Sequence, residues 1–351
     1  MFFLSSILLS GISVLAWEID TPEHLGMDQA KLEQARDYAL TGGGSGCIIR
    51  GGKQVMSWGD QSRQYDIYSS TKSIGGTVLG LAIKDGIMKL EDKARSHLST
   101  FGFPPESNKD TGWLEEVTIL HLGTHTAGFE KDRGWCKQYF EPGTGWHYSD
   151  GGTNWLADCL TTAYGMDLQD LMIDRVFSPL GITVGKERYG GEDLWWGYNK
   201  RGNEINGLNR RPFSAGIFAN VQAMAKIGYL YLRRGRWGDK QIIPESFVDM
   251  VRTTVPSVVG LPVMGDQYNR FAGASNHYGI LWWNNADGTI PGVPRDAYWA
   301  WGLKESLIVV IPSLDLVIAR AGEKGWQSDN WGSRYDVIKP FIEPICQSIS
   351  D

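Results

Sequence analysis

One serine and one lysine, three residues apart, have the types and the spacing that nucleophilic catalysis requires. Ser69 opens an S-S-T-K motif whose last residue is Lys72, and the following run, 73–84, has a helical pattern. A serine in the first turn of a helix lies at the positive end of its dipole. A side chain three positions later lies on the same face. Lys72 can then accept the hydroxyl proton if burial or neighbouring charge lowers its pKa. Ser70 has no lysine at this spacing, so Ser69 is the predicted nucleophile.

Further motifs follow this serine in a fixed order along the chain. They read L-G-T-H-T-A-G at 122–128, E-P-G-T-G-W-H-Y-S-D at 141–150, V-F-S-P-L-G-I at 176–182 and P-F-S-A-G-I-F-A-N at 212–220. With S-S-T-K, this series resembles the serine beta-lactamases and penicillin-binding-protein-like hydrolases. The branch it resembles most contains class C beta-lactamases, DD-peptidases and their esterase relatives. The resemblance covers residues 25 to 350, approximately.

The resemblance implies a role for four of these residues. Ser69 would accept the acyl group, Lys72 would be its base partner, and Tyr148 would shuttle a proton between nucleophile and leaving group. A phenol titrates near 10, so Lys72 must favour the anionic or strongly hydrogen-bonded form of Tyr148. Asp150 stands where the family usually has asparagine. A carboxylate there could keep Lys72 protonated and shift the role of base to Tyr148.

The family's third motif, K/H-T/S-G, is expected before the last predicted hairpin. Its best match here is Ala300-Trp301-Gly302, with Gly302 as the anchor. The backbone N–H groups of Ser69 and Leu303 would then form the oxyanion hole, which binds the charge that develops on the carbonyl oxygen. Trp301 is a candidate for the pocket wall.

Two residues beside Tyr148 are also candidates for the substrate pocket, namely Trp146 and His147. His125, within the H-T-A-G turn, is expected to be a structural turn residue. No H-E-x-x-H sequence occurs and the remaining histidines lack metal-ligand spacing. The sequence therefore predicts neither a metal site nor a cofactor.

Strand and helix patterns predict one antiparallel sheet that is built from both ends of the chain. A helix over 27–40 precedes a hairpin over 46–58, and a second hairpin over 306–319 precedes a helix over 331–349. A further strand is expected over 278–283. Between these ends, helical runs occupy 117–122, 153–163, 168–176 and 221–234.

The predicted fold class is therefore α+β, with the sheet flanked by helices and a large all-helical subdomain inserted, as in beta-lactamases and transpeptidases. We expect one catalytic unit whose site lies at the junction of its parts. The expected parts are a signal peptide over 1–16, a sheet subdomain formed by 17–75 and 275–351, and a mostly helical subdomain over 76–274.

The first sixteen residues are apolar and too short to span a membrane. Val14 and Ala16 are small residues at positions −3 and −1 of a cleavage site, which predicts export to the periplasm or the medium, although a buried strand or helix is an alternative. Export permits disulfides.

Four cysteines are available for such disulfides. A Cys136–Cys159 pair is favoured and a Cys47–Cys346 pair is possible. The alternative is four buried free thiols.

The composition of the chain limits the classes of partner that the protein can bind. The chain has 351 residues, a net charge of −6 and no long basic run, which argues against nucleic acid and stable membrane insertion. A small ester or amide substrate is expected; the oligomeric state is not predicted.

The third motif has Ala300 where the family has a cation for a substrate carboxylate, although Lys304 could restore one. Trp301 favours an uncharged group.

The sequence thus predicts an exported serine hydrolase that forms a Ser69 acyl-enzyme, with carboxylesterase activity favoured. DD-peptidase and beta-lactamase activities are the alternatives that share this machinery. A non-catalytic acyl-binding or sensor module on the same fold is the alternative of a different class.

Overall fold

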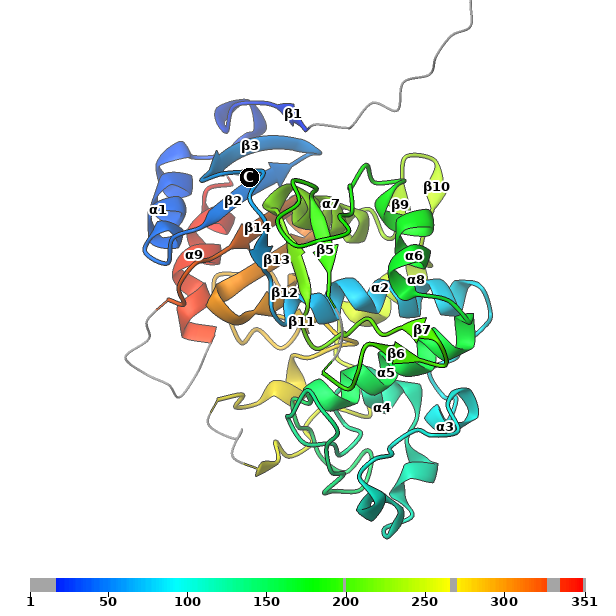
Figure 1. Cartoon of the computed structure of the whole chain (residues 1–351). Coiled ribbons are helices and arrows are strands. Elements are labelled where there is room, and N and C mark those ends of the chain that lie inside the picture. Colours follow the sequence, from blue (N-terminus) through cyan, green and yellow to red (C-terminus); the bar gives the residue numbers. More distant parts are fainter. Residues whose placement is uncertain (1–16, 198–199, 266–269, 327–334, 350–351) are drawn as a thin grey trace, which may run out of the picture.

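The computed structural model describes residues 17–197, 200–265, 270–326 and 335–349, and in it both chain ends join one seven-stranded sheet (Figure 1). Its order is β1-β3-β2-β14-β13-β12-β11, and every pair is antiparallel except β1 with β3. The predicted α+β class is confirmed. The strands are β1 (Glu18–Ile19), β2 (Ser45–Arg50), β3 (Lys53–Trp58), β11 (Trp283–Asn284), β12 (Tyr298–Gly302), β13 (Ser306–Ile311) and β14 (Leu316–Ala321).

Helices cover both faces of this sheet. Helices α1 (Gln29–Leu40) and α9 (Tyr335–Gln347) pack together on one face, and α2 (Ser70–Lys84) and α7 (Val221–Leu232) pack on the other (Figure 1). Because both faces are buried, the central strands are almost continuously apolar, S-L-I-V-V-I in β13 and L-V-I-A-R-A in β14. Successive side chains still alternate between the two cores, since strand side chains point to opposite faces.

The segment between the sheet-forming ends is mostly helical but is not free of strands. Besides α2 and α7, its α-helices are α3 (Ala94–His97), α4 (Ile119–Gly123), α5 (Asp150–Tyr164), α6 (Leu168–Met172), which continues into a π-turn (Ile173–Phe177), and α8 (Glu245–Val251). Its strands are β4 (Tyr65–Asp66), β5 (Leu194–Trp196) and β8 (Ile217–Ala219) in one small sheet, and the pairs β6 (Glu204–Ile205) with β7 (Leu208–Asn209) and β9 (Arg236–Trp237) with β10 (Lys240–Gln241). Two or three residues are too few to show alternation in the sequence.

Helix α2 is the element that holds the candidate nucleophile, and it is packed closely on two sides. A Cβ at Gly75 would lie 2.6 Å from the Phe213 ring, so this approach requires glycine. The Ser70 hydroxyl donates to the carbonyl of Ser306 (2.6 Å) and ties α2 to β13. The Ser70 hydroxyl is thus engaged in holding α2 against the sheet.

The prediction of a strand over 278–283 is wrong for most of that range. Only Trp283 of this run belongs to β11, and Tyr278 folds back onto it in an isolated bridge. Leu281 has a φ of +61°, which turns the chain between them. The helix expected over 331–349 is described from Tyr335 onward; residues 331–334 lie outside the described residues.

The favoured Cys136–Cys159 disulfide does not form, and all four cysteines are buried free thiols. The Cys136 sulfur packs against Gly151, in the first turn of α5. Cys159 lies eight residues further along the same helix, about 12 Å at 1.5 Å per residue, beyond the reach of a disulfide. Its thiol donates instead to the carbonyl of Ala94 (3.6 Å).

The Cys47–Cys346 pair is separated by the sheet. The Cys47 thiol faces α7 and donates to the carbonyl of Val221 (3.8 Å), whereas Cys346 belongs to α9 on the opposite face. The predicted signal peptide, 1–16, lies outside the described residues. Within the part of the chain that is described, no helix has the length and apolar character needed to cross a membrane.

Candidate active site

Ser69 stands at the turn that joins strand β4 to helix α2. Tyr68 has a φ of +47°, and its N–H donates to the side chain of Asp66 (2.8 Å), which holds the chain in this tight turn. Ser69 itself has helical dihedrals at the N-cap of α2. Its hydroxyl therefore lies at the positive end of a 15-residue helix, as predicted.

Lys72 is almost completely buried and contacts Ser69. Its Nζ lies 3.2 Å from Ser69 Oγ, 2.5 Å from Asp150 Oδ1 and 2.7 Å from the carbonyl oxygen of Ser214. The carboxylate and the carbonyl can only accept hydrogen bonds. A protonated Lys72 donates to all three groups. Once it has lost one proton, its two remaining N–H groups serve these two acceptors and its lone pair can face the Ser69 hydroxyl. This geometry suits proton transfer from Ser69 to Lys72.

The P-F-S-A motif supplies the carbonyl that contacts Lys72. The side-chain oxygen of Asn154, on α5, accepts from the backbone N–H groups of Phe213 (3.1 Å) and Ser214 (3.0 Å). These bonds fix the loop so that the carbonyl of Ser214 faces Lys72. A motif that showed only resemblance in the sequence thus has a definite position beside the site.

Asp150 is a buried carboxylate between two lysines. Its Oδ1 accepts from Lys72 and its Oδ2 from Lys131, and Arg133 Nε lies 3.8 Å from Oδ2. Burial by itself would raise the pKa of Asp150, but attraction to Lys72 and Lys131 outweighs burial and lowers this pKa to about 2. Burial lowers the pKa of Lys72, and the charge of Asp150 opposes that shift.

Tyr148 lies in the same cluster, in an aromatic stack. Its ring stacks on Phe271 (centroids 5.1 Å apart, 22°) and on Trp283 (6.0 Å, 18°). The ammonium nitrogens of Lys72 and Lys131 lie 4.7 and 4.9 Å from the ring centroid, within the range of cation–π attraction. The structure therefore brings Tyr148, Lys72 and Asp150 together, although they are far apart in the sequence.

A pocket of about 160 Å³ opens onto Ser69. The end of β12 forms one wall, because a Cβ at Gly302 would lie 3.1 Å from the Ser69 backbone nitrogen and 2.1 Å from the carbonyl oxygen of Ile67. Only glycine permits this approach, which carries the chain at Leu303 past the start of α2. The pocket is lined by Ser69, Lys131, Arg133, Tyr148, Asp150, Arg270, Phe271, Trp283, Trp301, Gly302 and Leu303.

Two predicted pocket residues do not line this pocket, and those predictions are wrong. Trp146 has no exposed surface and packs in the core beside Tyr148, because its backbone pairs with the 262–264 segment and directs the indole inward. His147 is 6% exposed, and its ring contacts Tyr139 and the carbonyl of Met264.

The remaining predicted residues near the pocket are placed as follows. Trp301 lines the pocket, as predicted. His125 is structural: its Nδ1 accepts from the N–H of Ser149 (3.1 Å), and burial together with the charge of Lys72 holds its pKa well below the ordinary value. Strand β12 ends at Gly302, and the following turn points Lys304 toward the Tyr68 ring (5.6 Å), so Lys304 does not supply the missing cation.

Four pocket residues were missed by the sequence analysis. They lie outside the motifs, and neither spacing nor composition distinguishes them from other loop residues. They are Lys131, Arg133, Arg270 and Phe271. Trp283, one of several tryptophans that the sequence offers as pocket walls, does line the pocket.

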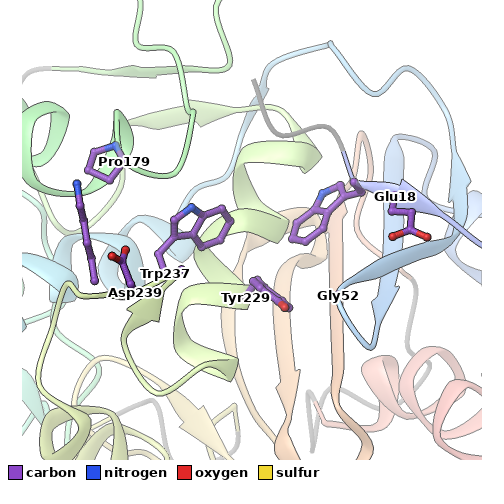
Figure 2. A pocket seen from close by; sticks show the side chains of 9 residues that line it. Glu18, Gly52, Pro179, Tyr229, Trp237 and Asp239 are labelled. Atoms are coloured by element: carbon purple, nitrogen blue, oxygen red, sulfur yellow. The ribbon is translucent and has the colours of Figure 1, made fainter. Parts of the chain in front are cut away.

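A larger pocket, of about 580 Å³, lies elsewhere and contains none of the predicted site residues. In Figure 2 the Tyr229 ring lies between the Trp237 indole and Glu18 of β1. Trp17 and Trp237 each meet the Tyr229 ring edge-on (78° and 88°). Its lining includes no serine, cysteine or histidine, so size alone does not locate the nucleophile.

Comparisons with known proteins agree with this fold. The beta-lactamase family model matches residues 30–321. An uncharacterized protein of Alkalihalophilus pseudofirmus is 23% identical over 296 residues, 80% of this chain and 79% of that protein.

Two solved structures share the fold. A penicillin-binding protein homologue from Caulobacter crescentus superposes with a TM-score of 0.65 at 13% identity, covering 92% of this chain and 99% of that one. A family VIII carboxylesterase superposes with a TM-score of 0.63 at 16% identity, with the same coverage. The family that the ordered motifs predicted is thereby confirmed: this chain belongs to the beta-lactamase family of serine hydrolases, which includes esterases and penicillin-binding proteins.

Proposed function

We propose that this protein is a serine hydrolase that cleaves small carboxylic esters through an acyl-enzyme on Ser69. The observation that carries the proposal is the contact between Ser69 Oγ and Lys72 Nζ (3.2 Å), on a lysine whose two other partners can only accept hydrogen bonds. In the neutral form of Lys72, those two acceptors take its two N–H groups and its lone pair faces the hydroxyl.

In the proposed reaction, Lys72 takes the Ser69 proton as Oγ attacks the ester carbonyl. The carbonyl oxygen, on which negative charge develops, accepts hydrogen bonds from the backbone N–H groups of Ser69 and Leu303. Tyr148 gives its phenolic proton to the leaving alcohol as the carbon–oxygen bond breaks, and Lys72 passes the proton taken from Ser69 to the phenolate. Water then attacks the acyl carbon, Lys72 takes one proton from this water and returns it to Ser69 Oγ, and the carboxylic acid leaves.

The pocket walls support an ester with apolar groups. Phe271, Trp283 and Trp301 give it an aromatic surface, and Ala300 stands where the third motif would supply a cation. The similarity to a carboxylesterase of known structure supports this proposal only at the level of fold, because the two sequences are 16% identical.

A second candidate function follows from two arginines at the pocket. Arg133 and Arg270 line it, and either guanidinium can bind a substrate carboxylate in place of the absent third-motif cation. Such a contact favours the alternatives predicted from the sequence, beta-lactamase and DD-peptidase. The pocket therefore contains features for both substrate classes, and their relative rates decide between them.

Three substrates and one covalent probe test these proposals on the purified full chain. We expect kcat/KM for p-nitrophenyl acetate or butyrate to exceed that for nitrocefin and for D-Ala-D-Ala peptides. Faster cleavage of nitrocefin would instead establish the second candidate. A fluorophosphonate should label Ser69, and Ser69→Ala should abolish both labelling and turnover. Failure to label would support a non-catalytic binding module.

Export is a further proposal, and it rests on the apolar run 1–16 with Val14 and Ala16 before the predicted cleavage site. We expect the mature protein, recovered outside the cytoplasm, to begin at Trp17. Intact-mass measurement of the native protein tests this directly, and a mass that includes residues 1–16 would contradict it.

A further inference from the structure

Asp150 stands where the family has asparagine, and the structure gives its carboxylate a second lysine partner. Lys72 donates to Oδ1, while Lys131 donates to Oδ2. Arg133 is a more distant neighbour, with Nε 3.8 Å from Oδ2. One carboxylate is thus shared between the candidate base and a lysine that no motif predicted.

The backbone holds Lys131 in this position. The N–H of Asp150 donates to the carbonyl of Lys131 (3.3 Å), and the hydroxyl of Ser149 donates to the carbonyl of Glu130 (2.6 Å). Both bonds join the Lys131 loop to the start of α5. The contact between Lys131 and Asp150 is therefore built into the local fold and does not depend on the reach of a flexible side chain alone.

An aspartate beside a buried lysine, with no other cation, holds that lysine in its protonated form. Such a lysine cannot take a proton from serine. A second cation on the same carboxylate offsets the attraction and repels a positive charge on Lys72. Burial lowers the pKa of both lysines, and Asp150 opposes the shift in each. Lys72 is 1% exposed whereas Lys131 is 43% exposed, so water reaches the Lys131 ammonium and Lys72 is the lysine that more readily becomes neutral.

We propose that Lys131 is a positioning residue, which neutralises Asp150 and so leaves Lys72 able to act as the base toward Ser69. The inference rests on the function proposed above. In the step concerned, the proton of Ser69 Oγ moves to Lys72 Nζ, and Asp150 and Lys131 keep their charges. The charged and titratable groups around Lys72 are Asp150, Lys131, Arg133, His125 and Tyr148.

The test measures the rate of Ser69 labelling by a fluorophosphonate between pH 5 and 10. This rate rises with pH as Lys72 loses its proton. Lys131→Met should move the rise to higher pH by about one unit, the scale of a single close charge, so labelling at pH 7 falls about tenfold and recovers at high pH. Asp150→Asn should move the rise to lower pH. The double variant should return close to the wild-type profile, because both opposing charges are gone.

Two further variants serve as controls. Lys93→Met removes a similarly exposed lysine (46%) from its ion pair with Glu116 (2.7 Å), outside the site, and should not change the profile. Lys131→Gln keeps a hydrogen-bond donor for Asp150 without the charge, so it should show the same shift of the pH profile. It tests the inference even if the methionine variant folds poorly.

The outcomes separate the inference from the function on which it rests. A Lys131 variant that lowers the rate equally at every pH, or leaves the profile unchanged, overturns the inference. A rise in rate with pH that Tyr148→Phe abolishes and that the Lys131 variants do not shift also overturns the inference, because the Tyr148 phenol is then the base. Wild-type protein that is not labelled at any pH contradicts the proposed function itself.

Discussion

Helix α5 contains two buried aspartates, each with cationic partners, but the partners that donate hydrogen bonds to them differ in chemistry. Asp150, in the first turn, contacts Lys72 and Lys131. Asp158, two turns later, contacts Arg201 and Arg210, each at 3.2 Å. Lysine can lose its proton in a buried site, whereas arginine keeps its proton throughout the physiological range. The first cluster can therefore perform proton transfer, and the second can only hold structure.

The environment of Asp158 fits a structural role. The Arg201 side chain also donates to the carbonyls of Gly134 (3.1 Å) and Gly151 (2.5 Å), and its guanidinium lies 4.2 Å from the Trp155 ring centroid. Burial raises the pKa of Asp158, and the two arginines oppose that shift. At Asp150 the balance is reversed and the pKa is lowered to about 2. The comparison teaches that similar charges on one helix serve chemistry or packing according to which cation is present.

The largest expected effect comes from giving the first cluster the cation of the second. Lys72→Arg places a permanent positive charge beside Asp150 and removes the ability to accept the Ser69 proton. We expect kcat/KM for p-nitrophenyl acetate to fall by about 10³–10⁴, at the upper end for a positioned base. Circular dichroism checks that the variant folds. A folded variant within tenfold of wild type would break the distinction between the two clusters.

Breaking the second cluster should affect stability and not catalysis. Arg201→Met leaves the buried Asp158 with one cation and should lower the free energy of unfolding by about 3–5 kcal/mol. Urea unfolding measures this, and active-site titration with a fluorophosphonate gives the activity per folded molecule, which should stay near wild type. The matched control is Arg175→Met, which removes the exposed pair with Asp85 and should cost about 1 kcal/mol or less. Equal losses in the two variants would contradict the structural role.

An aromatic ring lies beside each cluster, and only the first ring has a hydroxyl. Tyr148→Phe preserves the stack on Phe271 and Trp283 but removes the phenolic oxygen, so we expect kcat/KM for p-nitrophenyl butyrate to fall about 10²-fold. The midpoint of urea unfolding should change little. Wild-type turnover in this variant would remove Tyr148 from the proposed mechanism.

The smallest expected effect is on the pH dependence of stability. The pKa of Asp150 in the folded protein, about 2, lies below the ordinary value of 3.8. A lowered pKa stabilises the fold above the ordinary value, and this stabilisation is lost as the pH falls from about 4 toward 2. Urea unfolding between pH 5 and 2.5 should show a steeper loss in wild type than in Asp150→Asn. Parallel curves would show that the lysines do not lower this pKa.

Much of the fold and part of the site could be predicted because they depend on local patterns. The hairpins 46–58 and 306–319 have turn residues between apolar runs, and the structure confirms both. Gly302 was found through the order of the motifs, and it does lie against Ser69. Trp146 and His147 were wrongly assigned to the pocket because nearness in sequence to Tyr148 does not fix the direction of a side chain.

The disulfide prediction failed for a related reason. Cys136 and Cys159 are close in sequence, but one packs at the start of α5 and the other lies two turns further along it. Arg133 and Arg270, which add charge to the pocket, come from loops that tertiary contacts alone bring together. No local pattern records which distant loop a residue will face.

The sequence by itself determined the Ser69–Lys72 pair, because a spacing of three residues at a helix start places both side chains on one face whatever surrounds the helix. It also determined the family and the sheet that both chain ends build. Only the tertiary structure decided what the pair can do, because burial lowers the pKa of Lys72 while the charge of Asp150 opposes that shift. Asp150 is distant in sequence, and electrostatic interactions depend on separation in space.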